Sequence, residues 1–311
     1  MKSIYKYIVC ACTALTVTSC DFLDVVPDNV ATEEHVFADR YTAEKYLATC
    51  YWGLPKSSDW NANPGIFGAL EMIFNTEQSS IGGMKFGLGL DSPSSALINY
   101  WSNNGNVIRS LYAGIRECNT FMNGIVGVED LDEYEKNRMI AEVKVIKAYM
   151  HFYLLSYYGP ICPLRESPAV NESTQGVRVY REKVDDCFQY VIDLLDEAIE
   201  SNALPTVLSN PTTELGRFTL PAAHMLKAKA LVYWASPLFN GNTDYNSFLD
   251  HNGEPFFNQV YDASRWTTAV EACKKAINVC ESAGVRLYQT SDYIATKKMS
   301  DQTLLVQTLR G

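Results

Sequence analysis

The segment AYMHFYLLSYYGP, residues 148–160, decides the fold class of this chain. Its apolar side chains cover nearly the whole circumference of a helix, which is typical of a helix surrounded by other helices. The helical pattern begins near residue 132 and ends at Gly159-Pro160, because glycine commonly terminates helices and proline cannot continue them. We therefore expect a long central helix over residues 132–158.

Helical periodicity dominates the rest of the chain as well. Apolar side chains recur three or four positions apart in five further segments: 46–54, 107–125, 184–198, 221–235 and 264–284. The last of these carries the most regular apolar stripe, made of Trp266, Ala269, Val270, Cys273, Ala276, Ile277 and Cys280. The alternation typical of strands is almost absent. The sequence therefore predicts an all-α bundle or solenoid.

The spacing inside the central segment indicates a particular kind of helix pair. Ala148, Phe152 and Pro160 lie at offsets 0, 4 and 12, as do the later positions of a tetratricopeptide repeat. The tryptophan and Leu-Gly positions that open such a repeat are missing. We therefore expect tetratricopeptide-like helix hairpins joined by long loops rather than a regular array.

The first twenty residues have the pattern of a bacterial lipoprotein signal. Lys2 and Lys6 precede a short apolar run, residues 8–17, which is shorter than the roughly 20 residues that span a membrane. The sequence VTSC at 17–20 fits the motif in which the cysteine sulfur receives a diacylglyceryl group before cleavage. We expect residues 1–19 to be a signal peptide and Cys20 to be the site of lipid attachment, although an ordinary signal with a chance cysteine is the alternative.

Charge and cysteine content exclude several classes of protein. The formal net charge is −10, and removal of the signal would take away two lysines. An acidic chain is unsuited to nucleic acid, and its attachment to a membrane would depend on the lipid. Of nine cysteines, Cys50, Cys118, Cys187, Cys273 and Cys280 fall on apolar helix stripes, where thiols behave as small hydrophobes. Buried free thiols are the better interpretation of these cysteines, and a disulfide formed after export is the alternative.

Six blocks of sequence, in order along the chain, resemble the SusD/RagB family of nutrient-binding outer-membrane lipoproteins. They are SCDFLDVVPDN (19–29), LYAGIRECNTFMNGI (111–125), AEVKVIKAYMHFYLLSYYGPICPL (141–164), DLLDEAIE (193–200) with LP (204–205), GRFTLPAAHMLKAKALVYWASPLFNG (216–241) and RWTTAVEACKKAI (265–277).

The resemblance implies both a location and a partner. A member of this family would be anchored in the outer membrane and exposed at the surface. It would capture an oligosaccharide or another nutrient for a SusC-like TonB-dependent transporter. Family members are commonly much longer, so residues 20–311 are expected to form the N-terminal part of a typical helical domain, incomplete at its C-terminus.

The candidate ligand-binding residues lie in the long connection after the first helix. Sugars bind on aromatic rings flanked by amide and carboxylate groups, because C–H faces stack on rings while hydroxyls need hydrogen bonds. Residues that meet this description are Trp60, Glu71, Asn75, Glu77 and Trp101. Trp101 begins a predicted helix and is as well explained as a cover for the core. Core packing is also the better interpretation of Tyr149, Tyr153 and Tyr157, which recur four apart.

Catalysis has little support in the sequence. The motifs GxSxG and HExxH are absent, no cofactor motif is present, and His151 and His224 lie within apolar helices as core or interface residues. Asn240, Asn242 and Asp244 have the spacing of a calcium loop, but Tyr245 stands where such loops need glycine. We therefore expect neither an enzyme nor a metal protein. The alternative to nutrient binding is a helical-repeat scaffold lipoprotein in envelope assembly.

Overall fold

The computed structural model describes residues 33–55, 92, 99–102, 110–168, 172–173, 175–287, 300, 302–303 and 306. Over these residues the chain is helical, and its pairing of extended backbone is confined to isolated bridges such as Leu249–Pro255. In chain order the helices are α2 (Glu33–Val36), α3 (Arg40–Trp52), α6 (Leu111–Gly124), the short 3₁₀ helix η2 (Ile125–Gly127), α7 (Glu133–Tyr158), α8 (Val184–Glu200), α9 (Pro211–Glu214), α10 (Leu220–Ala235) and α11 (Ser264–Ser282). The predicted all-α class is confirmed.

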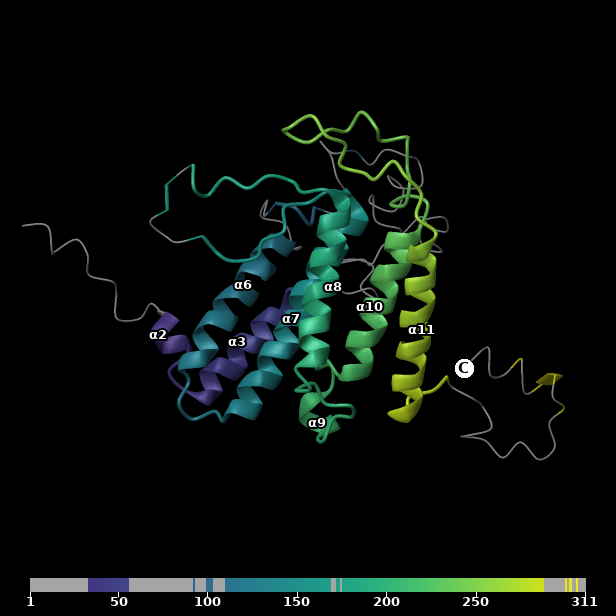
Figure 1. The fold of residues 1–311 in the computed structure, drawn as a ribbon. Helices are drawn as coiled ribbons and strands as arrows, with labels where there is room; N and C mark the ends of the chain where they lie inside the picture. The colour runs from purple at the N-terminus through teal and green to yellow at the C-terminus, as the bar shows by residue number, and fades with distance from the viewer. Residues whose placement is uncertain are drawn as a thin grey trace, which may run out of the picture.

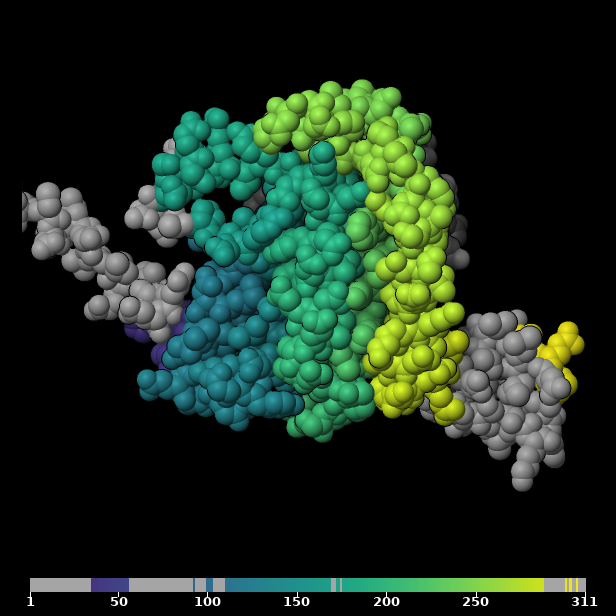
Figure 2. Space-filling view, in the orientation of Figure 1, coloured from purple at the N-terminus to yellow at the C-terminus, as the bar shows by residue number. Residues whose placement is uncertain are grey.

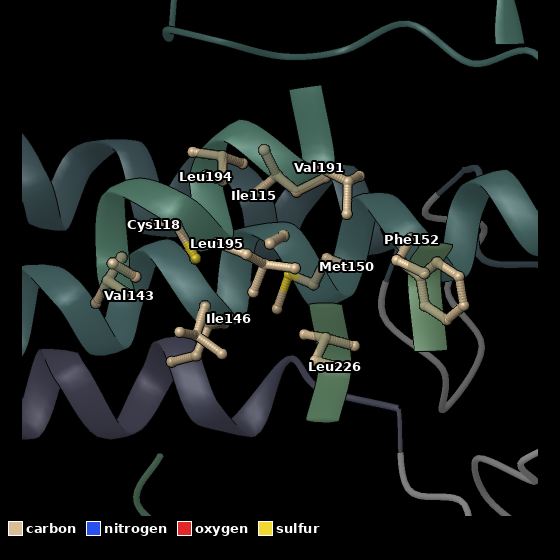
Figure 3. Packing of buried hydrophobic residues seen from close by; sticks show 14 of the residues in the cluster. Ile115, Cys118, Val143, Ile146, Met150, Phe152, Val191, Leu194, Leu195 and Leu226 are labelled. Atoms are coloured by element: carbon tan, nitrogen blue, oxygen red, sulfur yellow. The ribbon is translucent and has the colours of Figure 1, made fainter. Parts of the chain in front are cut away.

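Helix α7 lies at the centre of the bundle, as the segment 148–160 predicted. It packs against α3, α6, α8 and α10, while α11 packs on α10 at the edge (Figure 1). Figure 3 shows Val143, Ile146 and Met150 of α7 within one cluster together with side chains of neighbouring helices. Tyr153 is also buried and stacks between Tyr149 and Tyr157, so the core interpretation of these tyrosines is confirmed.

Local sequence explains both ends of α7. Asp132 accepts a hydrogen bond from the Glu135 backbone N–H at 2.8 Å, and the Glu135 side chain accepts one from the Asp132 N–H at 3.4 Å. This capping box satisfies two donors that would otherwise lack partners in the first turn. At the other end Gly159 has φ of 68°, which glycine adopts without a steric penalty.

Two glycines bring α3 and α6 into backbone contact. A Cβ atom added to Gly53 would lie 3.5 Å from the Cα of Gly114 and 2.9 Å from Met150 Cε. A Cβ on Gly114 would lie 2.8 Å from Met150 Sδ. Because neither residue has a side chain, the two helices cross closely and the methionine of α7 fills the space beside them.

A buried carboxylate links α7 to α3 and to the segment after α9. Glu142 is fully buried and accepts hydrogen bonds from Tyr51 at 2.8 Å, from Arg138 at 3.1 Å and from Arg217 at 3.0 Å. Such a charge is tolerated in a core only when it is paired and hydrogen-bonded. Through Glu142, helix α7 is therefore hydrogen-bonded to α3 and to Arg217 within an otherwise apolar core.

The apolar stripe predicted on the last helix is only partly in the core. Of its residues, Ala269 and Ala276 are buried against α10, whereas Trp266, Val270 and Ile277 are 39%, 48% and 52% exposed. Cys273 and Cys280 are half-buried, and Cys50, Cys118 and Cys187 are fully buried free thiols. Periodicity identified the apolar face of α11, but it could not show that α10 covers only one flank of that face.

Candidate functional site

Long connections gather at one end of the bundle. Residues 159–183 and 236–263 join helices at the upper end in Figure 1, whereas α6 is joined to α7 and α8 to α10 by shorter segments at the lower end. Figure 2 shows the 236–263 segment, in yellow-green, across this upper end. Binding residues concentrate on loops held by a rigid scaffold. We call this the loop end, and it is the candidate functional site.

Trp101 lies at the loop end, half-buried between the ends of α6 and α7. Its ring makes edge-to-face contacts with Tyr112, at 5.1 Å between centroids, and with Tyr158, at 5.4 Å. The Arg181 guanidinium lies 4.6 Å from the centroid of the indole and interacts with its π system. The rings and the guanidinium hold Trp101 in place, so most of its contact surface is already used within the protein.

The tyrosines around Trp101 also anchor the surrounding backbone. The Tyr112 hydroxyl accepts a hydrogen bond from the Cys162 N–H at 3.1 Å, and the Tyr158 hydroxyl accepts one from the Tyr100 N–H at 3.0 Å. Burial raises the pKa of Tyr112, which keeps its hydroxyl neutral at physiological pH. These contacts fix the segments before α6 and after α7 to the helices.

The base of the 236–263 segment is held by a buried asparagine and an ion pair. The Asn240 amide donates to the Asp262 carbonyl at 2.8 Å, and its carbonyl accepts from the Asp262 N–H at 2.8 Å. The Arg265 guanidinium binds both carboxylate oxygens of Asp185, at 2.9 and 2.6 Å. Asn240 thus holds the two ends of this segment together.

Several aromatic rings on these loops face solvent. Tyr180 stacks on His251 at 4.6 Å and Tyr245 stacks on Phe257 at 4.9 Å, yet both tyrosines stay exposed. Phe248 and Tyr261 are exposed as well. We call Tyr180, Tyr245, Phe248 and Tyr261 the aromatic loop set. Exposed rings are the groups on which the C–H face of a sugar stacks.

A hollow of about 340 Å³ lies beside the aromatic loop set. Its lining comprises Lys183, Asp185, Asp186 and residues 255–259. The volume is at the lower end of the range for ligand pockets. The lining combines the apolar side chains of Pro255, Phe256 and Phe257 with the charged groups of Lys183 and Asp186, while Asp185 is already bound by Arg265.

The positions of the predicted site residues divide into two groups. Trp101 is described and lies at the loop end, whereas Cys20, Trp60, Glu71, Asn75 and Glu77 lie outside the described residues. The sequence reasoning missed the aromatic loop set. Its signal was present in the aromatic residues of the connections 159–183 and 236–263, but no spacing in either connection predicted that the rings would share one end of the molecule.

The described histidines are few, and one of them is part of the core. His151 is fully buried, with its ring nitrogens bound to the Lys147 carbonyl at 2.8 Å and the Leu164 N–H at 3.2 Å, which confirms its structural role. Within the described part of the chain, no group of three or more His, Cys, Asp or Glu side chains is placed to hold a metal ion. No helix there is both long and apolar enough to cross a membrane.

Comparison with known proteins identifies related sequences and folds. A model of the SusD-like family, described as starch-binding and associating with the outer membrane, matches residues 21–231. These residues include the bundle from α2 to α8 and most of α10. No curated protein matches the sequence.

Solved structures share the fold at low sequence identity. BT4246 superposes with a TM-score of 0.68 at 23% identity, over 88% of this chain and 47% of its own. A SusD-like protein from Bacteroides fragilis, BF3747, has a TM-score of 0.54 at 18% identity, and the match covers 81% of this chain and 40% of that protein. A laminarin-binding SusD-like protein has a TM-score of 0.51 at 19% identity, and the match covers 67% of this chain and 45% of that protein. The chain therefore spans less than half the length of these structures, and the tetratricopeptide-like helical fold is confirmed.

Proposed function

The chain belongs to the SusD-like family of starch-binding proteins that associate with the outer membrane, and from this premise we propose that it binds a glycan at the loop end. The family match over residues 21–231 is the observation that carries the proposal. A relative named as laminarin-binding, similar in fold, is consistent with an oligosaccharide ligand. The protein would bind its ligand without turning it over.

The geometry of the loop end supports this ligand class. The aromatic loop set supplies exposed rings, and the neighbouring hollow supplies Lys183 and Asp186 as hydrogen-bonding groups. Trp60, Glu71, Asn75 and Glu77 follow α3 in the sequence, and Gly53 at the end of α3 lies beside Gly114 in the first turn of α6. We propose that the four residues after α3 complete the site, with Trp101 acting chiefly as a support for it.

The role in the cell follows from family and sequence together. We propose that Cys20 carries a lipid anchor, that residues 20–311 form the N-terminal part of a surface-exposed helical domain, and that the protein delivers its ligand to a SusC-like TonB-dependent transporter. The signal pattern at residues 1–20 and the family's association with the outer membrane support this assignment.

Isothermal titration against a panel of host and plant oligosaccharides tests glycan binding. We expect dissociation constants from micromolar to millimolar, or roughly −4 to −8 kcal/mol. Removal of one stacking ring costs about 1–3 kcal/mol, which is enough to abolish such binding. Trp60→Ala and Tyr180→Ala should therefore lose the ligand while retaining the helical circular-dichroism signal.

A matched control separates a site effect from general loss of structure. Tyr134 is an exposed aromatic residue near the start of α7, at the opposite end of the bundle, so Tyr134→Ala should bind as the wild type does. Absence of binding to every glycan, with a protein partner recovered from envelope extracts instead, would favour the scaffold alternative. Turnover of a glycan would contradict the assignment as a binding protein.

A further inference from the structure

Two buried thiols meet between α3 and α6. Cys50 of α3 and Cys118 of α6 have no exposed surface and belong to one core cluster between packed helices. After burial, the neighbouring Cys50 thiol is the next cause that raises the pKa of Cys118. Both are reduced in the structure. Figure 3 shows Cys118 turned into the packed core among aliphatic side chains. The two sulfur atoms are therefore neighbours even though 68 positions separate them in the sequence.

The close crossing of α3 and α6 brings the cysteine backbones near each other as well. Cys50 precedes Gly53 by three residues, and Cys118 follows Gly114 by four, so each cysteine lies about one helical turn from the glycine contact. A disulfide needs Cα atoms roughly 4.4–6.8 Å apart, and residues that face each other across two closely packed helices can reach that spacing because Cα atoms lie about 2.3 Å off each helix axis. The contact between Gly53 and Gly114 brings the two helices close at this point.

We propose that Cys50 and Cys118 form a disulfide when the chain folds in an oxidising compartment. Residues 1–19 have the pattern of an export signal, and exported proteins encounter disulfide-forming catalysts. The bond would join the helices on either side of the 53–110 connection, close to its two ends. It would therefore hold the two ends of this connection together.

The oxidant in this step is a carrier disulfide, supplied by a thiol–disulfide oxidase in the cell or by oxidised glutathione in vitro. One cysteine thiolate attacks a carrier sulfur and releases a carrier thiolate, leaving a mixed disulfide. The second cysteine thiolate attacks the bonded cysteine sulfur and expels the other carrier thiolate. Two protons leave the protein thiols, and the carrier disulfide takes up two electrons.

The reaction belongs to folding rather than to the folded protein. Burial raises the pKa of the Cys118 thiol, so the reactive thiolate is scarce in the native state. The core also shields both sulfur atoms from a carrier. Once formed, the bond is protected from reductants by the same burial.

Refolding of the purified wild-type chain tests the proposal directly. Unfolded, reduced protein is refolded with either oxidised glutathione or excess reductant, then alkylated and digested without reduction. We expect a peptide pair joined through Cys50 and Cys118 only in the oxidised sample. We also expect a melting temperature higher by roughly 5–10 °C, because the bond closes a long loop in the unfolded chain.

Variants separate this pair from the other cysteines. The increase in melting temperature should vanish in the Cys50→Ala/Cys118→Ala double variant and persist in Cys187→Ala, whose thiol donates to the Ile161 and Glu182 carbonyls at 3.7 Å. Alkylation of both Cys50 and Cys118 after oxidative refolding, or linkage of either to a different cysteine, would overturn the proposal. Peptide mapping uses the wild-type chain, so the result holds even if a variant fails to fold.

Discussion

His151 shows how burial sets the chemistry of a single residue. Its Nδ1 donates to the Lys147 carbonyl, since a carbonyl oxygen only accepts, and its Nε2 accepts from the Leu164 N–H. Acceptance at Nε2 requires the neutral ring with its proton on Nδ1, and burial lowers the pKa of His151 to about 3. The residue thereby fastens the segment after α7 back onto that helix.

This depressed pKa predicts a loss of stability in acid. In the unfolded chain His151 titrates near its ordinary pKa of 6.5, so the unfolded state binds the proton first as pH falls. The stabilisation of the folded state by neutral His151 is complete above about pH 7. It declines by about 1.4 kcal/mol per pH unit as the pH falls from about 6.5 to 3. Between pH 7 and 5, the free energy of unfolding of His151→Gln should fall by about 2 kcal/mol less than that of the wild type.

Urea denaturation at a series of pH values measures the difference. His251→Gln is the control, because His251 is exposed on a loop. If the free energy of unfolding changes equally with pH in the wild type and in His151→Gln, His151 does not take up a proton on unfolding.

Trp101 shows a limit of residue-level reasoning about function. An aromatic residue in a polar segment has the composition of a sugar platform, yet its ring interacts with Tyr112, Tyr158 and Arg181. The exposed rings of the aromatic loop set are better placed for stacking. Composition identifies residues able to stack, whereas only their neighbours decide which rings are open.

At the scale of elements, the α3–α6 crossing depends on glycine. Gly114→Ala would place a Cβ 2.7 Å from Met150 Cε, and Met150 is fully buried in the core. We expect this substitution to destabilise the protein by about 1–3 kcal/mol, as overpacking of cores does.

Thermal or urea unfolding checks this prediction against a second glycine. A Cβ on Gly127 would meet no atom within 4 Å, so Gly127→Ala should be neutral or slightly stabilising. A Gly114→Ala protein as stable as wild type would mean that Met150 moves aside freely and that the crossing is not tightly packed.

At the scale of the whole molecule, the bundle has one flank with exposed apolar side chains. Ile277 and Ala276 are adjacent on α11, but Ile277 is half exposed while Ala276 is buried against α10. Ile277→Lys should change the free energy of unfolding by less than about 1 kcal/mol, whereas Ala276→Lys should cost several times more, because it buries a charge. Urea denaturation of both variants makes the comparison, and equal losses would place Ile277 in a packed interface.

Attachment to the membrane is a second prediction at this scale. The Cys20 sulfur is the proposed acceptor of lipid, and without that lipid the acidic chain would have little electrostatic attraction for a membrane surface. Cys20→Ala should therefore move the protein from the detergent phase to the aqueous phase, or leave it unprocessed. A variant that still partitions into detergent after processing would contradict the lipid anchor.

The sequence alone determined the helical class, the central position of α7 and most helix boundaries. Each depends on local chemistry: the all-round apolar surface of 148–158, the capping pair Asp132 and Glu135, and the positive φ of Gly159. Family membership could also be expected from ordered blocks of sequence, and it is confirmed.

Only the tertiary structure decided which apolar and aromatic side chains are covered. Packing on α10 buries Ala269 and Ala276 but leaves Val270 exposed, although all three belong to one stripe. The contact between Cys50 and Cys118, and the gathering of the aromatic loop set at the loop end, join segments far apart in the chain. Periodicity describes one helix at a time, whereas burial and proximity depend on how neighbouring helices are placed around it.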